Sequence, residues 1–330
     1  MKVYLDKDID LSVLIDKKIG FIGYGSQGRA HALNLKDSGI KDISVALYEG
    51  SKTIEIAKND GFKVSSIQDV SAYADILVMA LPDERQSEVY DEFIAPNIKD
   101  GAALCFIHGL NIHFGLIKPK PTIDIFMVAP KGPGVAVRSE YLEGRGTLCL
   151  FAVDSNVSGR AKELALAYAK GLGCGKTAII ETIFKDETIG DLFGEQAILC
   201  GGLVGLIRSS FDVLVEGGVA PHIAYLECVH EVKLIADLIY KCGIADMNRR
   251  ISNTAEWGEY VSGCRVIDDK VIENMRDILS DIKNGKFVNN WISEYKNGLP
   301  NLKKIRELNE QQDVEKVGRE IRNFMPWLKG

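Results

Sequence analysis

A glycine-rich segment near the N-terminus, Gly23–Gly28, most constrains the fold of this chain. It has the spacing G-x-G-x-x-G, with glycine at Gly23, Gly25 and Gly28, and it directly follows the apolar run Lys18–Ile22. In a strand–turn–helix of this kind, the glycines permit a tight turn and a close approach of the backbone to a pyrophosphate, which the N-terminus of the helix attracts. We therefore predict a dinucleotide-binding unit. A purely structural glycine turn is the alternative.

Short apolar runs alternate with helix-like segments from residue 18 to about residue 182. Several are continuous Val/Ile/Leu stretches, which are typical of strands buried on both faces of a parallel sheet. The predicted strands are Lys18–Ile22, Ile43–Leu47, Ile76–Leu81, Ala103–Ile107, Ile123–Val128, Leu148–Val153 and Thr177–Ile180. The fold class is thus predicted to be α/β, with a Rossmann-type doubly wound parallel sheet in an N-terminal domain of residues 1–182.

The strand pattern ends there, and residues 183–330 are helical by their periodicity. The first two predicted helices, roughly Thr188–Glu216 and Pro221–Cys242, are unusually apolar for surface helices, which indicates burial against a partner or in a tightly wound domain. We therefore predict an all-α C-terminal domain and a homo-oligomer, at least a dimer, in which a second copy covers these helices. The charge-rich stretch Asn301–Arg322 is predicted to form a solvated terminal helix.

Composition excludes several other classes of protein. The 330 residues include 40 basic and 46 acidic ones, for a net charge of -6, so the general basic footprint of a nucleic-acid-binding protein is absent. The uncharged apolar stretch Ala197–Ile207 is far shorter than the roughly 20 residues that span a bilayer, so no membrane helix is expected. The N-terminal residues resemble no secretory signal, and we expect a cytoplasmic protein. The seven cysteines never form Cys-x-x-Cys and are expected to be free, buried thiols.

The residues after the second predicted strand bear on the choice of cofactor. Glu49 lies 21 positions after Gly28, where a dinucleotide fold places the carboxylate that binds the ribose hydroxyls, and this favours NADH. Ser51, Lys52 and Thr53 are the counter-argument, because two hydroxyls and an ammonium group are able to hold the 2′-phosphate of NADPH. NADH is the preferred prediction, since an acidic residue repels a phosphate and this loop contains no arginine.

Three further segments follow predicted strands, at the carboxyl edge of the sheet where ligands of such folds bind. They are Leu81–Gln86, His108–Asn111 and Ala129–Gly134. The side chain of His108 is a candidate proton donor or acceptor, although a loop histidine bound to backbone is the ordinary alternative. Lys131, held among prolines and glycines, is a candidate for polarising a carbonyl or binding an anion, against the alternative of a solvated lysine in a turn.

Two pairs of carboxylates stand out in the helical half. Asp191 and Glu195 are four residues apart, as are Glu227 and Glu231, so each pair shares one helix face, where like charges repel. The second pair lies in a largely apolar helix. Ligands that are all oxygen indicate a hard cation, most plausibly Mg²⁺, and unpaired surface acids are the alternative.

Taken together and in this order, these segments resemble those of the ketol-acid reductoisomerase family, short-chain class I, over nearly the whole chain. The resemblance rests on GYGSQG (Gly23–Gly28), HGLNI (His108–Ile112), APKGPG (Ala129–Gly134), DLFGEQ (Asp191–Gln196), Glu227–Glu231 and ISNTAE (Ile251–Glu256). It implies Mg²⁺-dependent alkyl migration in 2-acetolactate or 2-aceto-2-hydroxybutyrate, followed by reduction with NADH or NADPH to the 2,3-dihydroxy acid. These products lead to valine, leucine and isoleucine.

The resemblance also implies roles for individual residues. Two Mg²⁺ per active site would be bound by Asp191, Glu195, Glu227 and Glu231, the last two from the other subunit of an interlocked dimer with a knotted helical domain. Ser252 would contact the substrate, and His108, Lys131 and Glu195 would be catalytic. The cofactor site would be lined by Tyr24, Gly25, Ser26, Gln27, Tyr48, Ser51, Thr53, Asp83, Glu84, Arg85, Gln86 and Gly134.

The sequence departs from the family pattern at three positions. Tyr48 stands where many NADPH-using relatives have a basic residue, which supports NADH. Arg29 and Val135 each stand where histidine is common in the family, and neither residue has a role assigned above. Two rival interpretations are a metal-free hydroxy-acid dehydrogenase, which leaves the paired carboxylates unexplained, and a nicotinamide-sensing protein without turnover, which would not need the polar groups to converge.

Overall fold

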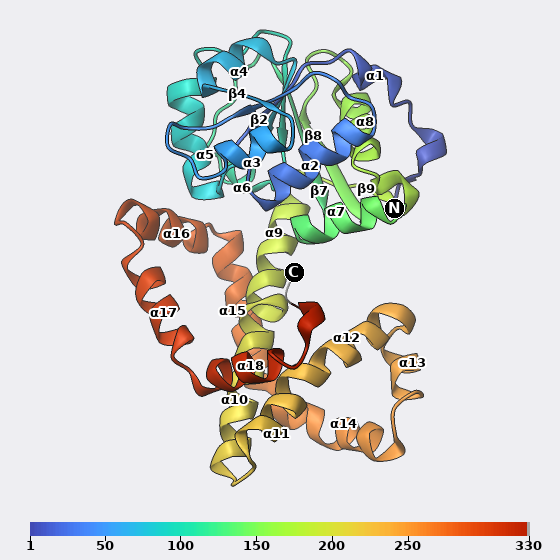
Figure 1. Ribbon diagram of the computed structural model, residues 1–330, viewed down its shortest axis with the longest axis vertical. Helices are drawn as coiled ribbons and strands as arrows, with labels where there is room; N and C mark the ends of the chain where they lie inside the picture. The colour runs from blue at the N-terminus through green and yellow to red at the C-terminus, as the bar shows by residue number, and fades with distance from the viewer. Residues whose placement is uncertain (329–330) are drawn as a thin grey trace. The chain divides into compact units, whose positions relative to one another are not determined.

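The computed structural model describes residues 1–328, which form two compact units, Met1–Gly190 and a second unit that begins at Asp191. Helix α9 (Phe184–Gly194) crosses the boundary between the units as one continuous helix. The first unit is a sheet with helices on both faces, and the second unit is entirely helical among its described residues (Figure 1). The predicted α/β class, followed by an all-α part, is confirmed.

The sheet of the first unit has nine strands in the order β1-β9-β8-β7-β6-β5-β2-β3-β4. The strands are β1 (Val3–Tyr4), β2 (Ile19–Ile22), β3 (Ile43–Ala46), β4 (Lys63–Ser65), β5 (Ile76–Met79), β6 (Ala103–Phe106), β7 (Asp124–Pro130), β8 (Cys149–Ser155) and β9 (Ile179–Glu181). Strand β2 pairs in parallel with β3 on one side and with β5 on the other. The strand order reverses at β2, and dinucleotides bind at such a reversal.

Successive side chains of the buried strands point to opposite faces of the sheet, as the twofold period of a strand requires. Phe21 and Val78 enter a core that is covered by α1, α2 and α8, while Ile22 and Leu77 enter a second core that is covered by α4 and α5. The helices of this unit are α1 (Ser12–Ile15), α2 (Ser26–Asp37), α3 (Ile54–Asn59), α4 (Ile67–Tyr73), α5 (Asp83–Val89), α6 (Leu110–His113), α7 (Gly134–Leu142) and α8 (Ala161–Gly171).

The sequence predicted a parallel sheet, but the sheet is not parallel throughout. Strand β8 runs antiparallel to β7, and β1 runs antiparallel to β9. Pro130 at the end of β7 pairs with Cys149 at the start of β8, so the connection through α7 leaves and re-enters the sheet at one edge. Such a return forces antiparallel pairing, whereas a crossover would give parallel pairing. The short strands β1 and β4 have too few residues for a periodic signal and were not predicted.

The second unit continues from α9 through a succession of helices. Its described helices are α10 (Gly201–Glu216), α11 (Pro221–Tyr225), α12 (Glu231–Cys242), α13 (Ile244–Asn248), α14 (Asn253–Val266), α15 (Asp269–Lys283), α16 (Lys286–Lys296), α17 (Pro300–Glu310) and α18 (Asp313–Arg322). Two π-helical turns, Glu195–Leu199 and Leu226–His230, join α9 to α10 and α11 to α12. The two long helices predicted from the sequence are therefore present, the first of them beginning at Phe184.

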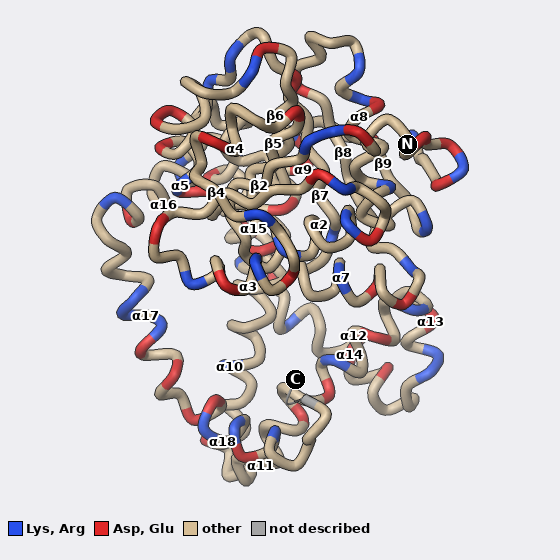
Figure 2. Tube along the Cα trace, turned by 45° about the horizontal axis from the view of Figure 1, so that its top comes forward, with Lys and Arg blue, Asp and Glu red and all other residues tan. Residues whose placement is uncertain are grey.

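The charge-rich terminal stretch forms two helices, α17 and α18, and not the single helix that was predicted. Lys or Arg positions are mixed with Asp or Glu positions along both helices (Figure 2). The break falls at Gln311 and Gln312, after which Asp313 begins α18. One face of α18 is not solvated, because Val314 is buried in a small core with Phe211 and Tyr225.

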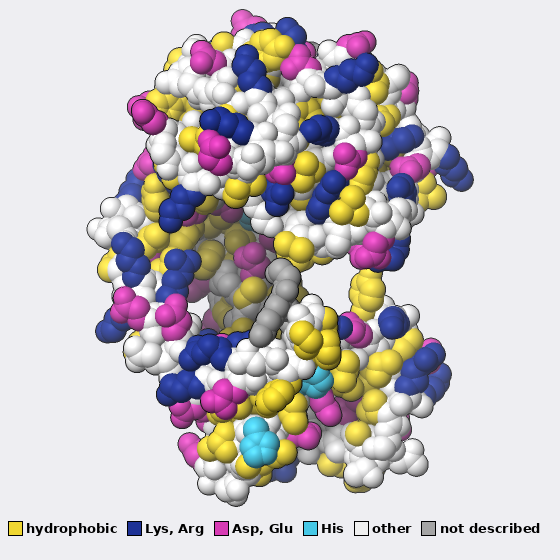
Figure 3. All heavy atoms as spheres, in the orientation of Figure 1, with side chains coloured by type: hydrophobic (Ala, Val, Ile, Leu, Met, Phe, Trp, Pro, Cys, Tyr) yellow, Lys and Arg dark blue, Asp and Glu magenta, His cyan; other side chains and the backbone are white. Residues whose placement is uncertain are grey.

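The continuous helical segment Phe184–Glu216 is unusually apolar and exposed. It has 33 residues and a mean hydropathy of 1.7 over its most apolar 18-residue window, of which only 6% is buried. By length and composition alone this segment is able to cross a membrane. Helices that are covered by other protein have the same length and composition. Hydrophobic side chains reach the surface in this unit (Figure 3), among them Leu199, Val213 and Tyr240. Large exposed apolar patches are typical of surfaces that bind protein or membrane.

The seven cysteines are free, as predicted, but they are not uniformly buried. Cys105, Cys149 and Cys174 are buried in the core of the first unit, whereas Cys200 and Cys264 are exposed. The exposed pair lies on the helical unit, where apolar faces are uncovered. The expectation of burial was therefore wrong for these two residues.

Candidate active site

The glycine-rich turn has the backbone geometry that a pyrophosphate site needs. Gly23 has a φ of +100°, and a Cβ atom there would lie 2.7 Å from the carbonyl oxygen of Ala80. Only glycine fits this combination of left-handed backbone and close approach. Helix α2 begins at Ser26, directly after the turn, so the unpaired N–H groups of its first turn face the carboxyl edge of the sheet.

A cavity of about 1030 Å³ opens at this edge and lies entirely within the first unit. It extends from Ser51 and Thr53, past the glycine-rich turn, to His108. Of the residues assigned to the cofactor from the sequence, those on its wall are Gly23, Tyr24, Gly25, Ser26, Gln27, Tyr48, Glu49, Ser51, Thr53, Asp83, Arg85 and Gln86. A cavity of this volume accommodates a dinucleotide.

Three of the assigned residues do not line the cavity. Gly28 lies behind the turn, where a Cβ atom would be 2.9 Å from Cβ of Ala80, so its function is close packing of helix on strand. At Gly134 a Cβ atom would overlap the carbonyl oxygen of Ser26, which lets α7 approach the start of α2. Glu84 lies on α5 outside the wall. Any contact of these three residues with cofactor stays a prediction.

The loop that follows β3 carries the groups that bear on cofactor choice. The hydroxyl groups of Ser51 and Thr53 are 3.1 Å apart, and Tyr48 and Glu49 are exposed. Arg85, from the neighbouring helix α5, places its guanidinium carbon 5.5 Å from the centre of the Tyr48 ring. The loop itself contains no arginine, as the sequence shows, but the fold supplies one from another segment.

A network of side-chain amides joins the two loops that bound the cavity beside His108. The Nε2 group of Gln86 donates to the carbonyl oxygen of Leu81 (2.9 Å) and to Asp83 (3.0 Å). The Nδ2 group of Asn111, which is fully buried, donates to the carbonyl oxygen of Asp83 (2.9 Å) and to Gln86 (3.1 Å). The segments 81–86 and 108–111 are thus held as one wall.

A buried carboxylate that sequence reasoning missed, Glu187 of α9, lies at the centre of the polar groups. Its Oε1 atom is 3.1 Å from Nζ of Lys131, and its Oε2 atom is 3.3 Å from Nδ1 of His108 and 3.4 Å from the backbone N–H of Gly109. Burial by itself would raise the pKa of Glu187, but the hydrogen bond from His108 and the charges of His108 and Lys131 outweigh it and lower the pKa. His108 and Lys131 thus meet at one carboxylate. His108 is not simply a loop histidine bound to backbone, and Lys131 is not simply a solvated lysine in a turn.

The signal that could have revealed Glu187 is its spacing. It lies four residues before Asp191, which lies four before Glu195, so three carboxylates follow one another at helical intervals. His108, Glu187 and Asp191 each offer a ligand atom within 4.8 Å of the others. Asp191 is placed by the same continuous helix as Glu187. The donor set, with two carboxylates, suits a divalent cation.

The remaining predicted metal and substrate ligands lie in the second unit. Glu195 begins one π-helical turn and Glu227 lies within the other, and such turns occur frequently at functional sites. Glu227 and Glu231 are exposed. Ser252 is exposed, and its Oγ accepts a hydrogen bond from the backbone N–H of Ala255 at the start of α14.

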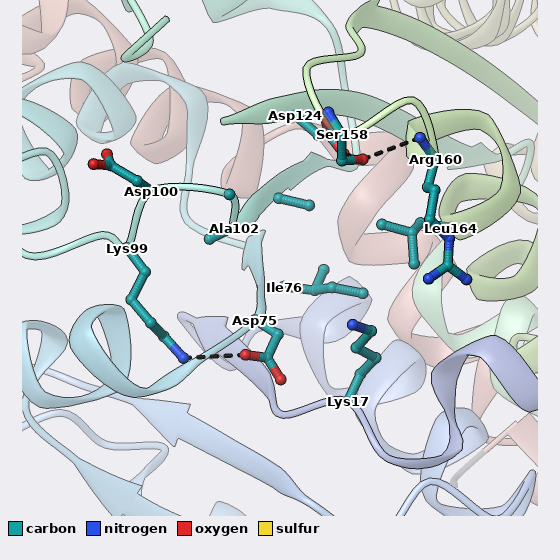
Figure 4. A pocket seen from close by; sticks show the side chains of 12 residues that line it. Lys17, Asp75, Ile76, Lys99, Asp100, Ala102, Asp124, Ser158, Arg160 and Leu164 are labelled. Atoms are coloured by element: carbon teal, nitrogen blue, oxygen red, sulfur yellow. Dashed lines mark hydrogen bonds and ion pairs between the residues drawn. The ribbon is translucent and has the colours of Figure 1, made fainter. Parts of the chain in front are cut away.

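A second, smaller hollow of about 220 Å³ lies at the opposite, amino edge of β5, β6 and β7 (Figure 4). Its acidic groups are satisfied within the protein. Asp75 pairs with Lys99 at 3.0 Å, Asp124 accepts the N–H of Ser158 at 2.9 Å, and Asp100 accepts the hydroxyl of Thr122. These polar groups hold the edge of the sheet together, and the chemistry concentrates at the carboxyl edge.

The fold and the site define an NAD(P)-dependent oxidoreductase with an acidic metal site. Comparison with protein families makes this specific: residues 13–178 match the family described as acetohydroxy acid isomeroreductase, NADPH-binding domain, and residues 184–327 match ketol-acid reductoisomerase, C-terminal domain. The chain belongs to the ketol-acid reductoisomerase family. The predicted resemblance is confirmed over nearly the whole chain.

Solved structures agree with this assignment. An NADH-preferring ketol-acid reductoisomerase from an uncultured archean is 48% identical, with a TM-score of 0.95 and coverage of 98% of this chain and 99% of that one. A semialdehyde dehydrogenase NAD-binding protein from Cupriavidus necator (18% identity, TM-score 0.61, 82% and 99% covered) shares the fold only. The same holds for a pyrroline carboxylate reductase from Plasmodium falciparum (20%, 0.51, 81% and 97%).

The chain is therefore an NAD(P)H-dependent ketol-acid reductoisomerase by family. It isomerises and reduces 2-acetyl-2-hydroxy acids in branched-chain amino-acid biosynthesis, and an acidic cluster suited to Mg²⁺ is present in the structure. The metal-free dehydrogenase and the nicotinamide-sensing protein are excluded by this membership.

Proposed function

We propose that this enzyme prefers NADH and that its active site is completed by a second copy of the chain. The observation that carries the first part is the composition of the cavity wall beside β3, where Glu49 and the uncharged Tyr48 replace the cations that a 2′-phosphate would need. A carboxylate favours the ribose diol and repels a phosphate. The 48%-identical archean relative is described as NADH-preferring. Ser51, Thr53 and Arg85 leave room for slower use of NADPH.

For the chemical steps, we assign the cations to Asp191 and Glu195 together with Glu227 and Glu231 of a second copy. These four acids would hold Mg²⁺, which when bound would supply Lewis-acid chemistry to the substrate hydroxyl and its neighbouring carbonyl. Glu195 relays the hydroxyl proton, and Ser252 contacts the substrate. Glu187 stays ionised and fixes the side chains of His108 and Lys131.

The position of His108 brings the cofactor cavity next to the acidic groups, so that reduction and isomerisation share one site. It lines the cofactor cavity with one side and contacts Glu187 with the other. A hydride donor bound in the cavity with its nicotinamide end near His108 would therefore meet a substrate held by the acids. This arrangement supports one site for both the isomerisation and the reduction.

A homodimer, alone or within a larger assembly, is proposed from the exposed apolar helices. Leu199, Val213 and Tyr240 expose more than half of their surface, which water does not favour. Covering by a second copy would bury these residues and bring in the exposed Glu227 and Glu231. We also propose that the dimer is interlocked, with a knotted helical domain, and that the protein is cytoplasmic. The chain is proposed to divide functionally into residues 1–182 and 183–330.

Initial rates of nicotinamide oxidation with 2-acetolactate test the proposal. NADH and NADPH are compared in parallel, each with Mg²⁺ and with excess chelator. We expect turnover only with Mg²⁺ and a higher kcat/KM with NADH. The variant Glu49→Gln is expected to raise kcat/KM for NADPH several-fold, while Glu55→Gln, an exposed acid on α3, leaves it unchanged. A higher kcat/KM of the unaltered enzyme with NADPH would refute the NADH preference.

A further inference from the structure

One polar cluster beside the cofactor cavity is built around a residue that has no part in the function described so far. Its centre is Asp60, the residue that directly follows α3 and caps its C-terminal end. The Asp60 carboxylate accepts two hydrogen bonds from the Arg29 guanidinium (Nε at 2.7 Å and Nη2 at 3.0 Å) and one from the Tyr24 hydroxyl at 2.8 Å. The backbone carbonyl of Asp60 accepts a fourth bond, from Nζ of Lys36, at 2.7 Å.

The contacts are stronger than those of an ordinary surface ion pair. The carboxylate is 15% exposed, and its bond with Arg29 is bidentate, which fixes orientation as well as distance. Hydrogen bonds from Arg29 lower the pKa of Asp60, so it is ionised at neutral pH. The Phe62 ring packs edge-on against Tyr24 (5.9 Å) and beneath the ammonium group of Lys36 (5.1 Å).

These contacts connect the two parts of the cavity that receive opposite ends of an ADP moiety. Tyr24 lies inside the glycine-rich turn, at the pyrophosphate, and Arg29 and Lys36 lie on the helix that follows it. Helix α3 follows the β3 loop that carries Ser51 and Thr53, at the ribose. Because α3 has only six residues, about 9 Å of helix, fixing Asp60 directly after it also fixes its first residue.

We propose that Asp60 is a positioning residue for the dinucleotide. By holding the end of α3 against the pyrophosphate turn, it sets the distance between that turn and the loop that binds the adenosine ribose. The inference rests on the proposed function only in that the cavity takes a nicotinamide dinucleotide. It gives Arg29, one of the departures from the family pattern, a role in cofactor affinity without any contact to cofactor.

The test is the variant Asp60→Asn, which keeps the size of the side chain and removes its charge. We expect the Kd for ADP-ribose, measured by titration calorimetry, and the KM for NADH to rise about tenfold, equivalent to about 1.4 kcal/mol. The kcat and the KM for 2-acetolactate should stay within twofold. Arg29→Lys, which keeps the charge and loses the bidentate bond, should give a smaller rise in the same two quantities.

A matched control is Asp42→Asn, because Asp42 also accepts a tyrosine hydroxyl, that of Tyr73 at 2.6 Å, but lies away from the cavity. It should leave ADP-ribose binding unchanged. Unchanged ADP-ribose binding in Asp60→Asn would overturn the proposal. A kcat and a 2-acetolactate KM that change as much as the NADH KM would also overturn it, since that pattern indicates general disruption. If Asp60→Asn does not fold, Arg29→Lys decides by the same criteria.

Binding of ADP-ribose needs no turnover, and this separates the two proposals. A wild-type protein that binds ADP-ribose but does not oxidise NADH with 2-acetolactate would contradict the proposed function and leave the role of Asp60 to be decided by the variants. A wild-type enzyme that is active and NADH-preferring, with Asp60→Asn binding ADP-ribose equally well, would overturn only the positioning role.

Discussion

The ammonium group of Lys131 lies 3.1 Å from the carboxylate of Glu187, a side chain that is only 1% exposed. The lysine comes from the loop after β7 and the glutamate from α9, and the second carboxylate oxygen is 3.3 Å from His108. One buried acid therefore holds two cationic or proton-bearing groups at fixed positions. A buried carboxylate with two such partners is stable in its charged form, which keeps both partners oriented.

Removal of this charge should impair catalysis more than cofactor binding. We expect Glu187→Gln to lower kcat about a hundredfold, the lower end of what positioned acid–base groups contribute, because His108 and Lys131 lose their common partner. The KM for NADH should change less than threefold. Steady-state kinetics with 2-acetolactate measure both quantities. The neighbouring exposed residue provides a control, Asp186→Asn, which should retain wild-type kcat; normal kcat in Glu187→Gln would disprove the role.

Arg85 is expected to affect the two cofactors unequally. Its guanidinium group stands over Tyr48 at the edge of the ribose loop, within the cavity wall. Arg85→Ala should raise the KM for NADPH about tenfold, the cost of one charge-assisted hydrogen bond, and the KM for NADH only a few-fold, through lost stacking. The exposed residue Glu88 on the same helix supplies the control Glu88→Gln. Equal effects on both cofactors would show that Arg85 does not distinguish the 2′-phosphate.

Local sequence signals predicted most of the first unit. Continuous apolar strands, a glycine turn between strand and helix, and polar residues at strand ends are short-range features, and the structure placed twelve of the assigned cofactor residues on one cavity wall. The antiparallel β8 was not predictable in this way, because its direction depends on where α7 packs. That packing depends on Gly134 meeting Ser26, more than a hundred residues earlier.

Glu187 and Arg85 show a second limit. In the sequence, Glu187 is one of several acids in an amphipathic segment, and its burial follows only from the tertiary placement of His108 and Lys131. The arginine near the ribose loop, Arg85, comes from a different strand–helix unit; the family resemblance assigned it to the cofactor site, but the sequence did not place it beside Tyr48. The second unit exposes Glu227 and Glu231, and a single chain does not reveal their partners.

Buried His31 predicts a pH dependence of stability. It is fully buried on α2, where its Nδ1 atom is 3.1 Å from the Tyr168 hydroxyl, and burial lowers its pKa to about 3. The unfolded chain, with an ordinary histidine pKa near 6.5, binds the proton first as the pH falls, so the contribution of His31 to stability is full above that pH and is lost between pH 6.5 and pH 3.

We therefore expect the free energy of unfolding to fall by about 2 kcal/mol from this residue between pH 7.5 and pH 5. Denaturant unfolding at the two pH values measures the change. The variant His31→Leu should lose this part of the pH dependence, whatever its stability at pH 7.5. A control variant, His222→Gln, alters an exposed histidine and should keep the wild-type dependence. An identical pH dependence in His31→Leu and wild type would contradict the prediction.

The acids of the second unit should matter for metal-dependent turnover. We expect Glu227→Gln and Glu231→Gln to lose Mg²⁺-dependent oxidation of NADH with 2-acetolactate, while binding of NADH, measured by its fluorescence, stays within twofold. The reason is that loss of one carboxylate weakens a cation site that is built from oxygen ligands. Asp237→Asn, which removes the partner of Lys233 on the same face of α12, is the control. Normal activity in both glutamate variants would refute the metal assignment.

The final prediction concerns the assignment of ligands to two chains. Suppose that Asp191 and Glu195 of one copy act with Glu227 and Glu231 of another. Glu195→Gln and Glu227→Gln are then each inactive as pure proteins. A mixed dimer of the two variants, however, has one site with both defects and one site with none. Co-expression of the two variants should therefore restore about a quarter of wild-type activity, because about half of randomly paired dimers are mixed and each has one intact site. Co-expression of Glu195→Gln with Asp191→Asn, two defects on the same side of the site, should restore nothing. Absence of recovery in the first pair, with mixed dimers verified by differential tags, would mean that all four carboxylates of a site belong to one chain.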